Sequence, residues 1–470
     1  MKYVSTRGGA PPVGFADAMI AGLAPDGGLY VPATVPQLDG EELQRWASLS
    51  YAQLAAAVIQ LFAPDMDRET ISKACAGAYS AEVFGSSEVT PLTPFLDDTW
   101  LLHLANGPTL AFKDLAMQLL GRLFDAELAR RQEKVLVVGA TSGDTGSSAE
   151  HAMIGRSNVG VVMLSPWGRV SPFQAAQMYS LDEPNIVNLA IDGVFDEAQD
   201  LVKAVNADAE FKARYSIGAV NSINWARVAA QIVYYVWAYL RLAREPGQEI
   251  QVAVPTGNFG NIYAGMMARR LGLPLRFILA TNENDVLDEF FRTGVYRVRP
   301  KDQVAETSSP SMDIAKASNF ERFIYDLHGG DGAAIAKLWV QLNNTGQFDL
   351  ATHPAFAAVG ERLVSGASSH QTRIQTIRRI AVQEGRLVDP HTADGVHVAA
   401  NRRRSGTVVC LETAQPTKFA ATIVEALGQE PPRPASFVGL EEREQHVTVI
   451  EPDVAAVRAE IVAFANREGG

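Results

Sequence analysis

The sequence predicts an α/β protein with mostly parallel sheets flanked by helices and an accessory domain at the N-terminus. From Lys134 onward, short runs rich in Val, Ile and Leu alternate with helical segments, which is the pattern of parallel strands joined by covering helices. These runs show little polar alternation, as expected for strands that are buried on both faces. The first 92 residues mix helical stretches with turns rich in Gly and Pro and lack this alternation. We therefore expect an N-terminal domain at 1–92, a core of two α/β subdomains at 93–430 and a C-terminal extension at 431–470.

Six runs are expected to form strands, at 134–140, 159–165, 185–191, 251–256, 275–281 and 406–413. After Thr281 the pattern is mainly helical. The last run, 406–413, follows these helices and is expected to rejoin the sheet. The apolar stretch from Val228 to Leu240 is interrupted by Gln231 and is shorter than the ~20 residues needed to span a bilayer. It is expected to form a buried helix.

The composition is that of an ordinary globular chain, with 47% hydrophobic and 20% charged residues among 470. Because 41 basic residues face 53 acidic ones, the net charge is −12, and a broad basic face for nucleic acid or an anionic membrane is not expected. Any anion site must therefore be local. The first residues lack the apolar core of a secretory signal, and we expect a cytoplasmic protein.

Cysteine and histidine give no sign of a metal site or of disulfides. Cys75 and Cys410 are the two cysteines, far apart in the chain, and are expected to be buried, unreactive thiols. His391 and His397 do not have the spacing of helical metal ligands. We expect no metal site.

Lys113 lies where a loop passes into a helix, in the segment NGPTLAFKDLAMQLLGRLF. The positive end of a helix dipole opposes an ammonium charge there and favours the neutral amine that a nucleophile needs. The apolar face of the helix is expected at Leu115, Leu119, Leu123 and Phe124. A lysine considered alone would be expected to lie at the surface in contact with solvent. The role expected for Lys113 therefore depends on the motifs described next.

Two glycine-rich turns each follow a predicted strand and open a helix. The first, GATSGDTGSS at 139–148, is neither a Walker A loop nor a GxGxxG dinucleotide motif, but its backbone N–H groups and hydroxyls suit an anion. The second is PTGNFGNIYAG at 255–265, in which one phosphate is expected to be surrounded by the amides of Gly257, Asn258, Phe259, Gly260 and Asn261. A glycine of this turn is expected to need a positive φ. We expect both turns at the carboxyl edge of one parallel sheet, where α/β sheets place ligands.

Seven segments, taken in order, closely resemble threonine synthases of the longer microbial type: YVSTRGG, GPTLAFKDL, GATSGDTGS, NSINWAR, PTGNFGN, SMDI with SNFER, and DPHTADG. The resemblance extends from Tyr3 to about Phe419. It implies the fold type II architecture of pyridoxal-phosphate enzymes, with pyridoxal 5'-phosphate as the cofactor. It also implies the conversion of O-phosphohomoserine and water into threonine and phosphate.

The resemblance also implies roles for individual residues. Lys113 matches the lysine that carries the cofactor, and Gly257 to Asn261 match the loop that holds the cofactor phosphate. The loop that faces the substrate carboxylate and the ring oxygen of the cofactor is matched by Thr141, Ser142, Gly143, Asp144 and Thr145. Thr413 matches the partner of the pyridine nitrogen. The best candidates for donors to the substrate phosphate are Arg169, Asn221, Ser222, Asn224 and Arg227.

Two positions depart from the family pattern. In CLETAQPTKF, Glu412 replaces a small hydroxyl residue and Gln415 replaces a histidine, and we expect Glu412 to face outward and not to bond the ring. Asp144 stands where related fold type II enzymes often carry Asn. Its carboxylate would repel the ring oxygen unless it is protonated, turned away or bonded to backbone amides.

Two other functions stay open. A serine or threonine dehydratase, or another β-replacement enzyme of this fold, could use Lys113 and both turns, but would not share STRGG and NSINWAR. A catalytically idle homologue could bind a phosphorylated amino acid or a protein, although the intact Lys113 and turns argue against it. The sequence leaves the oligomeric state open between a monomer and a homodimer.

Overall fold

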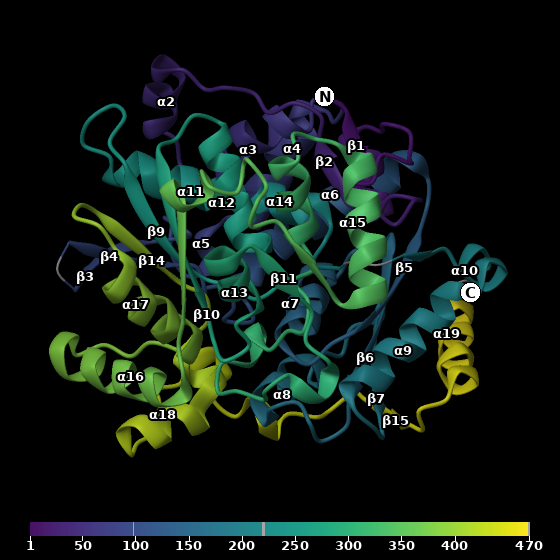
Figure 1. Cartoon of the computed structure of the whole chain (residues 1–470). Coiled ribbons are helices and arrows are strands. Elements are labelled where there is room, and N and C mark those ends of the chain that lie inside the picture. Colours follow the sequence, from purple (N-terminus) through teal and green to yellow (C-terminus); the bar gives the residue numbers. More distant parts are fainter. Residues whose placement is uncertain (97, 219–220, 469–470) are drawn as a thin grey trace. The chain divides into compact units, whose positions relative to one another are not determined.

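The computed structural model describes residues 1–96, 98–218 and 221–468 (Figure 1). The chain divides into two compact units. Unit 1 comprises Met1–Asn106 and Ser222–Pro432, and unit 2 comprises Gly107–Asn221 and Arg433–Gly470.

Unit 2 is built on a five-stranded, fully parallel sheet with the strand order β15-β7-β6-β5-β8. Helix α9 packs on one face with α19 against it, which is visible at the right of Figure 1, and α7 packs on β6 with α6 and α8 against it. The strands are β5 (Val135–Ala140), β6 (Val159–Pro166), β7 (Ile186–Ile191), β8 (Ile217–Gly218) and β15 (Thr448–Ile450). The helices are α6 (Lys113–Arg131), α7 (Asp144–Met153), α8 (Pro172–Tyr179), α9 (Phe195–Ala207), α10 (Ala209–Arg214) and α19 (Val454–Glu468).

Local sequence explains these elements. Every residue of β6 is buried, which agrees with its uninterrupted apolar run. Helix α9 buries Ala198, Leu201 and Val205, which lie on one helical face, and Glu197 accepts a hydrogen bond from the Val194 N–H at its N-terminus. In α6 the predicted apolar face is buried, as expected.

Unit 1 contains a six-stranded sheet with the order β13-β10-β9-β14-β4-β3, in which β3 alone runs antiparallel to its neighbour among the described strands. Helix α17 packs on one face of this sheet, backed by α16 and α18, and α12 and α13 pack on β10 and β13. The strands are β3 (Leu92–Phe95), β4 (Thr99–His103), β9 (Ile250–Pro255), β10 (Leu275–Thr281), β13 (Leu363–Ala367) and β14 (Val408–Glu412). The helices after the N-terminal region are α11 (Trp225–Leu242), α12 (Gly260–Arg270), α13 (Val286–Thr293), α14 (Phe320–Leu327), α15 (Gly332–Thr345), α16 (His370–Glu384), α17 (Pro390–Arg402) and α18 (Ala420–Leu427).

The N-terminal region mixes helices with turns, as predicted, and it belongs to unit 1. Helix α3 packs against α11, and the Trp225 indole donates to the Tyr3 hydroxyl at 2.9 Å, which in turn donates to the Phe62 carbonyl at 2.7 Å. The region contains β1 (Tyr3–Ser5), α1 (Phe15–Ala21), β2 (Tyr30–Pro32), α2 (Gly40–Ala47), α3 (Tyr51–Phe62), α4 (Arg68–Ala78) and α5 (Ala81–Phe84).

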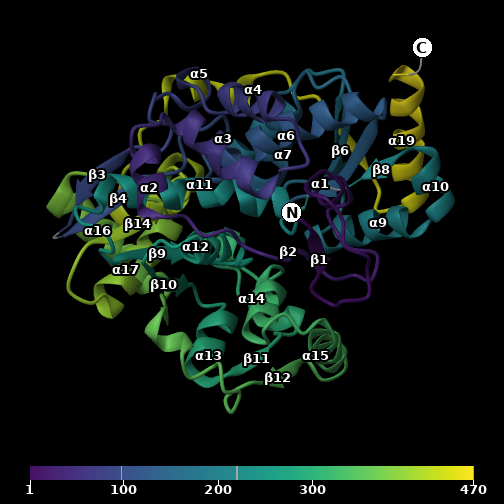
Figure 2. The same cartoon turned by 90° about the horizontal axis from the view of Figure 1, so that it is seen from above.

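All six predicted strands are present, and β14 rejoins a sheet between β9 and β4. Two expectations were wrong. The two glycine-rich turns follow β5 and β9, which lie in different sheets, because apolar runs reveal strands but not which sheet they join. The region after Thr281 also contains β13 and a small ribbon of β11 (Val295–Arg297) and β12 (Gln347–Asp349), which Figure 2 shows grouped with α13 and α15. These strands are short and half polar, so they give little periodic signal.

The apolar stretch from Val228 to Leu240 lies in α11 and is buried throughout apart from one intermediate position at its end, as predicted. Among the described residues, no helix is long and apolar enough to cross a membrane. Cys75 and Cys410 are free and buried, and burial raises the pKa of each thiol to about 12, so both are unreactive at neutral pH.

Candidate active site

Lys113 is the first residue of α6, and the loop before it is fixed by a buried carboxylate. Asp114 accepts hydrogen bonds from the Thr109 N–H at 2.8 Å and from the Thr109 hydroxyl at 2.7 Å. The same hydroxyl lies 2.9 Å from the Ser148 hydroxyl of α7. Leu110 adopts a left-handed φ of 59° within this loop. The amine of Lys113 is therefore carried on a rigid frame and not on a mobile surface loop.

The side chain of Lys113 is 15% exposed, and its Nζ lies 3.7 Å from Oδ2 of Asp144, which is 5% exposed. The other oxygen of Asp144, Oδ1, accepts a hydrogen bond from the Gln174 amide at 2.7 Å. The carboxylate of Asp144 is thus occupied by a cation and an amide donor, which is how an aspartate at this position can avoid repelling an anionic ligand oxygen.

The turn at 141–145 is organised by its own threonine. The Thr141 hydroxyl accepts from the N–H groups of Gly143 at 3.0 Å and Gly146 at 2.8 Å, so it closes the first turn of α7. Gly143 has a φ of 143°, and a Cβ there would lie 2.8 Å from the Gln174 side chain. Ser142 is exposed and Thr145 is half-buried, so these two hydroxyls are less enclosed than that of Thr141.

In unit 2 this turn leaves the sheet at a topological switch point. Strands β6 and β7 extend from one side of β5, and β8 pairs with its other side. The loops that follow the strands on either side of such a point diverge, and α/β sheets bind ligands in the crevice between them.

Unit 1 has an equivalent switch point between β9 and β14. From β9 the chain moves outward to β10 and β13, and then returns with β14 to the opposite side of β9. The turn Gly257 to Asn261 follows β9, and Thr413 follows β14, so two predicted cofactor sites leave adjacent parallel strands at the same edge. The Thr413 N–H donates to the Thr392 hydroxyl at 3.3 Å.

In the turn after β9, the residue with positive φ is Phe259, at 64°. The expectation of a glycine was wrong, because the phenyl ring of Phe259 stabilises the left-handed backbone by packing against three other rings. Its ring centroid lies 6.1, 5.2 and 5.7 Å from those of Phe291, Phe320 and Phe323. Gly257 is required for space, since a Cβ there would lie 2.9 Å from the Ser311 carbonyl oxygen.

The SNFER segment holds this turn from the other side. The Asn258 carbonyl accepts from the Asn319 N–H at 3.0 Å and from its side-chain Nδ2 at 3.1 Å, and Nδ2 also donates to the Ser222 carbonyl at 3.1 Å. Arg322 is fully buried and donates to Asn319 Oδ1 and, at 2.6 Å, to the Ile223 carbonyl. The segments NSIN, GNFGN and SNFER are therefore joined by one buried network.

The sequence had given Asn319 and Arg322 no role. The signal that could have found Arg322 is a charged residue within the amphipathic helical segment FERFIYDL, and Asn319 directly precedes that segment.

Arg227 is a buried cation that stands on α11. Among the residues that the structure describes, no acceptor lies within hydrogen-bond reach of its Nε or Nη1. Burial lowers the pKa of this guanidinium to about 10, so it is still charged at neutral pH. A buried cation with two nitrogens that lack acceptors costs free energy, and an anionic ligand would lower that cost.

The other predicted phosphate ligands have different surroundings. Asn224 caps α11 by accepting from the Ala226 N–H at 3.0 Å, and it donates to the Met19 carbonyl at 2.8 Å. The Ser222 hydroxyl lies 3.1 Å from that of Ser318. Asn221 has a buried Oδ1 with no donor among the described residues. Arg169 is exposed in the turn between β6 and α8 and belongs to unit 2, whereas Arg227 belongs to unit 1.

Glu412 does not face outward, and that expectation was wrong. It is 4% exposed, and its Oε2 lies 2.7 Å from Nδ1 of His103. The reason is that β14 is an inner strand, and its register places Glu412 opposite His103 of β4. Burial raises the pKa of the Glu412 carboxyl, with a smaller lowering from His103. Gln415 is half-buried.

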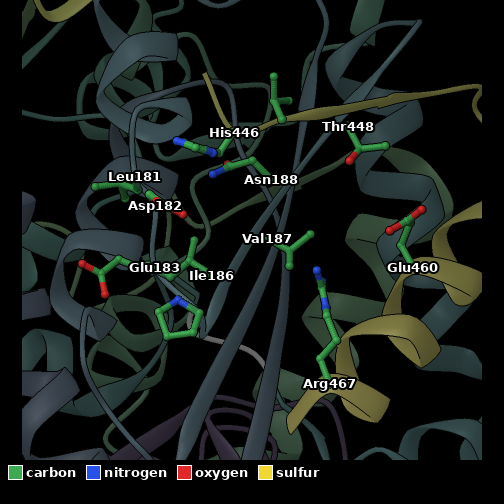
Figure 3. Close-up of a pocket in the computed structure, with 12 residues that line it drawn as sticks. Leu181, Asp182, Glu183, Ile186, Val187, Asn188, His446, Thr448, Glu460 and Arg467 are labelled. Carbon is green, nitrogen blue, oxygen red and sulfur yellow. The ribbon is translucent and has the colours of Figure 1, made fainter. Parts of the chain in front are cut away.

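A cavity of ≈ 640 Å³ lies beside β7, β15 and α19 in unit 2 (Figure 3). Glu460 and Arg467 approach it from α19, and His446 and Asn188 line it as well. None of the described residues that were predicted for the active site lines this cavity, so it is not the candidate site.

Models of known protein families match the regions of the chain that contain the predicted site residues. The sequence model described as "Pyridoxal-phosphate dependent enzyme" matches residues 89–338, more than half of the chain. Together with the lysine at the start of α6 and the two switch points, this match defines the class of the protein as a pyridoxal-phosphate-dependent enzyme.

Two narrower models also match, "Threonine synthase N terminus" over residues 2–79 and "Threonine synthase, C-terminal" over residues 392–461. The chain is 53% identical to a threonine synthase of Corynebacterium glutamicum, over 99% of both chains, and 49% identical to one of Methylobacillus glycogenes, over 98% of this chain and 99% of that one. A crystal structure of threonine synthase from Brucella melitensis with bound pyridoxal phosphate superposes with a TM-score of 0.95, at 42% identity over 99% of both chains. The chain belongs to the threonine synthase family.

Proposed function

We propose that this protein is a pyridoxal-phosphate-dependent enzyme that converts O-phospho-L-homoserine and water into L-threonine and phosphate. The observation that carries the proposal is Lys113, held at the start of α6 with its Nζ 3.7 Å from Asp144, in a chain that is 53% identical to a threonine synthase over 99% of its length.

The residues present fit a phosphorylated cofactor and a phosphorylated substrate. In unit 1, the Asn261 side-chain Nδ2 and the Arg227 Nε and Nη1 are buried donors with no acceptor among the described residues. Unsatisfied buried donors are rare in proteins, and a bound ligand is one source of the acceptor that they need. Asn261 belongs to the glycine-rich turn and Arg227 to α11, so each of these donors could serve a phosphate group.

When bound, pyridoxal phosphate supplies an electron sink for the bond changes at the substrate carbons. Lys113 is proposed to carry the cofactor and, once released from it, to move protons at successive carbons of the substrate. The helix end at α6 favours the neutral amine, and Asp144 favours the ammonium form. The neutral amine has a lone pair that accepts a proton, and the ammonium form can release it again.

Arg227 is proposed to bind the substrate phosphate, since a planar guanidinium donates two parallel hydrogen bonds to phosphate oxygens. The other assignments stay part of the proposal. Gly257, Asn258, Phe259, Gly260 and Asn261 hold the cofactor phosphate, and Asp144 and Thr413 contact its ring. The substrate is bound by Thr141, Ser142, Gly143, Thr145, Arg169, Asn221, Ser222 and Asn224.

We propose further that residues 1–92, 93–430 and 431–470 are the N-terminal, catalytic and C-terminal parts, and that the enzyme is a monomer or homodimer in the cytoplasm. The net charge of −12 supports a small-molecule substrate without nucleic acid or a membrane.

Borohydride reduction of the protein with its cofactor tests the role of Lys113. The expected result is the cofactor mass on the peptide that contains Lys113. Lys113→Ala should lose both the label and turnover, whereas the exposed Lys212→Ala should keep both. A label on another lysine, or near-normal turnover in Lys113→Ala, would contradict the assignment.

A further inference from the structure

One face of α11 carries a row of buried polar side chains toward the start of α12. Gln231, Tyr234 and Tyr235 follow Arg227 at helical spacing, and all are buried. The Gln231 side-chain Nε2 donates to the Arg227 carbonyl at 2.8 Å, and its Oε1 lies 3.2 Å from the Tyr234 hydroxyl. Helices α11 and α12 pack against each other in unit 1.

The row ends on Asn261, the second residue of α12. Its side-chain Oδ1 accepts from the Tyr234 hydroxyl at 2.6 Å and from the Tyr235 hydroxyl at 2.7 Å, which is the shorter of two contacts of Tyr235, since the Asn261 carbonyl lies 3.0 Å away. Burial raises the pKa of both phenols well above its ordinary value, so both keep the proton that they donate.

These two contacts fix the direction of the amide. Separations of 2.6 and 2.7 Å are those of O–H···O hydrogen bonds, whereas an amide N–H donor would stand at about 2.9–3.0 Å. The two donors also occupy both lone pairs of Oδ1. The amide nitrogen must therefore face away from the tyrosines.

That nitrogen, Nδ2, is buried, and among the described residues it has no acceptor, although Asn261 as a whole is 7% exposed. It lies in the first turn of α12, directly after the glycine-rich turn, where free backbone N–H groups and the helix dipole already favour an anion. A buried donor at such a position suits a ligand that supplies the acceptor.

We propose that Tyr234 and Tyr235 are positioning residues that orient the Asn261 amide so that Nδ2 donates to a phosphomonoester at the start of α12. This inference rests on the proposed function. Of the two phosphomonoesters in that reaction, we assign the phosphate of the cofactor. The Cα atoms of Arg227 and Tyr234 are about 10 Å apart along α11, at ~1.5 Å of rise per residue, which leaves Arg227 to serve a second phosphate.

The test compares the binding of pyridoxal phosphate and of pyridoxal, which has the same ring but no phosphate, to the apo-protein. In the double variant Tyr234→Phe/Tyr235→Phe the rings stay and only the hydroxyls are lost. Its affinity for pyridoxal phosphate should fall by roughly tenfold or more, since a hydrogen bond to a charged group is lost, while its affinity for pyridoxal stays unchanged. A purely structural role of the tyrosines would lower both affinities together and would overturn the proposal.

Two further variants sharpen the result. Asn261→Asp keeps an acceptor for the tyrosines but replaces the donor with a negative oxygen, so its loss of pyridoxal phosphate affinity should exceed that of the double variant. Tyr263→Phe is the matched control, because this buried tyrosine of α12 bonds Asp326 at 3.0 Å and not Asn261, and both of its affinities should match those of the unaltered protein.

The apparent KM for O-phosphohomoserine at saturating cofactor distinguishes the two phosphates. The double variant should keep its KM if the cofactor phosphate is the acceptor. A raised KM with unchanged affinity for pyridoxal phosphate would overturn the assignment to the cofactor. Failure of the proposed function gives a different result, because the unaltered protein would then not turn over O-phosphohomoserine at all.

Discussion

Replacement of Arg227 by methionine should change stability and substrate affinity in opposite directions. The guanidinium of Arg227 is buried, and its Nε and Nη1 have no acceptor among the described residues. Methionine keeps the apolar stem of the side chain and removes the charge. The ligand-free protein should therefore become more stable, while the enzyme loses a ligand for the substrate phosphate.

The expected changes in free energy follow from the two nitrogens of Arg227 that have no acceptor among the described residues. Leaving a buried donor without an acceptor costs about 1–3 kcal/mol, so Arg227→Met should raise the free energy of unfolding of the ligand-free protein by about that amount. Loss of an arginine that bonds a buried phosphate should cost roughly 2–5 kcal/mol of binding, which raises the required concentration of O-phosphohomoserine roughly 30-fold or more.

Arg322 provides a matched control on the same unit. It is also fully buried, and burial likewise lowers its pKa to about 10, but it donates to three acceptors, which include the carbonyls of Tyr30 and Ile223. Arg322→Met leaves these acceptors without a donor and should lower the free energy of unfolding by about 2–5 kcal/mol.

Denaturant unfolding of the ligand-free variants, combined with steady-state kinetics of the cofactor-loaded ones, measures both effects. If Arg227→Met destabilises the ligand-free protein as Arg322→Met does, then Arg227 has a structural partner. If its apparent affinity for O-phosphohomoserine is normal, the substrate phosphate is bound elsewhere. Either outcome would contradict the assignment of the Arg227 Nε and Nη1 to the substrate phosphate.

Two other predictions concern a buried carboxyl and the glycine-rich turn. Burial raises the pKa of Glu150 well above its ordinary value, against a smaller lowering by the Asn188 amide, so its contribution to stability is present at low pH and is lost as the pH rises above that ordinary value. In denaturant unfolding between pH 5 and 8, the free energy of unfolding of Glu150→Gln should rise relative to that of the unaltered protein by up to about 1.4 kcal/mol per pH unit. The free energy of unfolding of the control Glu133→Gln, at an exposed position, should follow that of the unaltered protein at every pH. Gly257→Ala should weaken cofactor binding by apo-protein more than Gly260→Ala, because the added Cβ would lie 2.9 Å from a backbone oxygen in the first case and 3.1 Å from a side-chain amide in the second.

Parallel pH curves for Glu150→Gln and the unaltered protein would mean that Glu150 is ionised in the folded state. Equal cofactor affinities for the two alanine variants would mean that the backbone around Gly257 adjusts without moving the turn.

The strands and the position of Lys113 could be predicted because they depend on local pattern. Buried parallel strands are continuous apolar runs, and a lysine at a loop-to-helix junction is visible from its neighbours in the sequence. The assignment of strands to two sheets could not be predicted, because it depends on contacts between segments far apart in the chain.

The residues that surround the site could not be predicted from the sequence, because their positions also depend on contacts between segments far apart in the chain. Glu412 was expected at the surface as a charged residue, and its burial depends on His103, which is more than 300 residues away. The left-handed Phe259 depends on an aromatic cluster from α13 and α14. Tyr234 and Tyr235 belong to an apolar stretch of sequence, and the contact of their hydroxyl groups with Asn261 depends on the packing of α11 against α12.

Turnover of O-phosphohomoserine in water enriched in oxygen-18, with both products followed, tests the proposed function. The cofactor-loaded protein should release phosphate and L-threonine from O-phosphohomoserine in equal amounts. The bond between Cγ and oxygen is broken and water adds at Cβ, so the heavy oxygen should appear in the threonine hydroxyl and not in the phosphate. Homoserine with labelled phosphate would reveal a phosphatase, and no release of phosphate at all would contradict the proposed function itself.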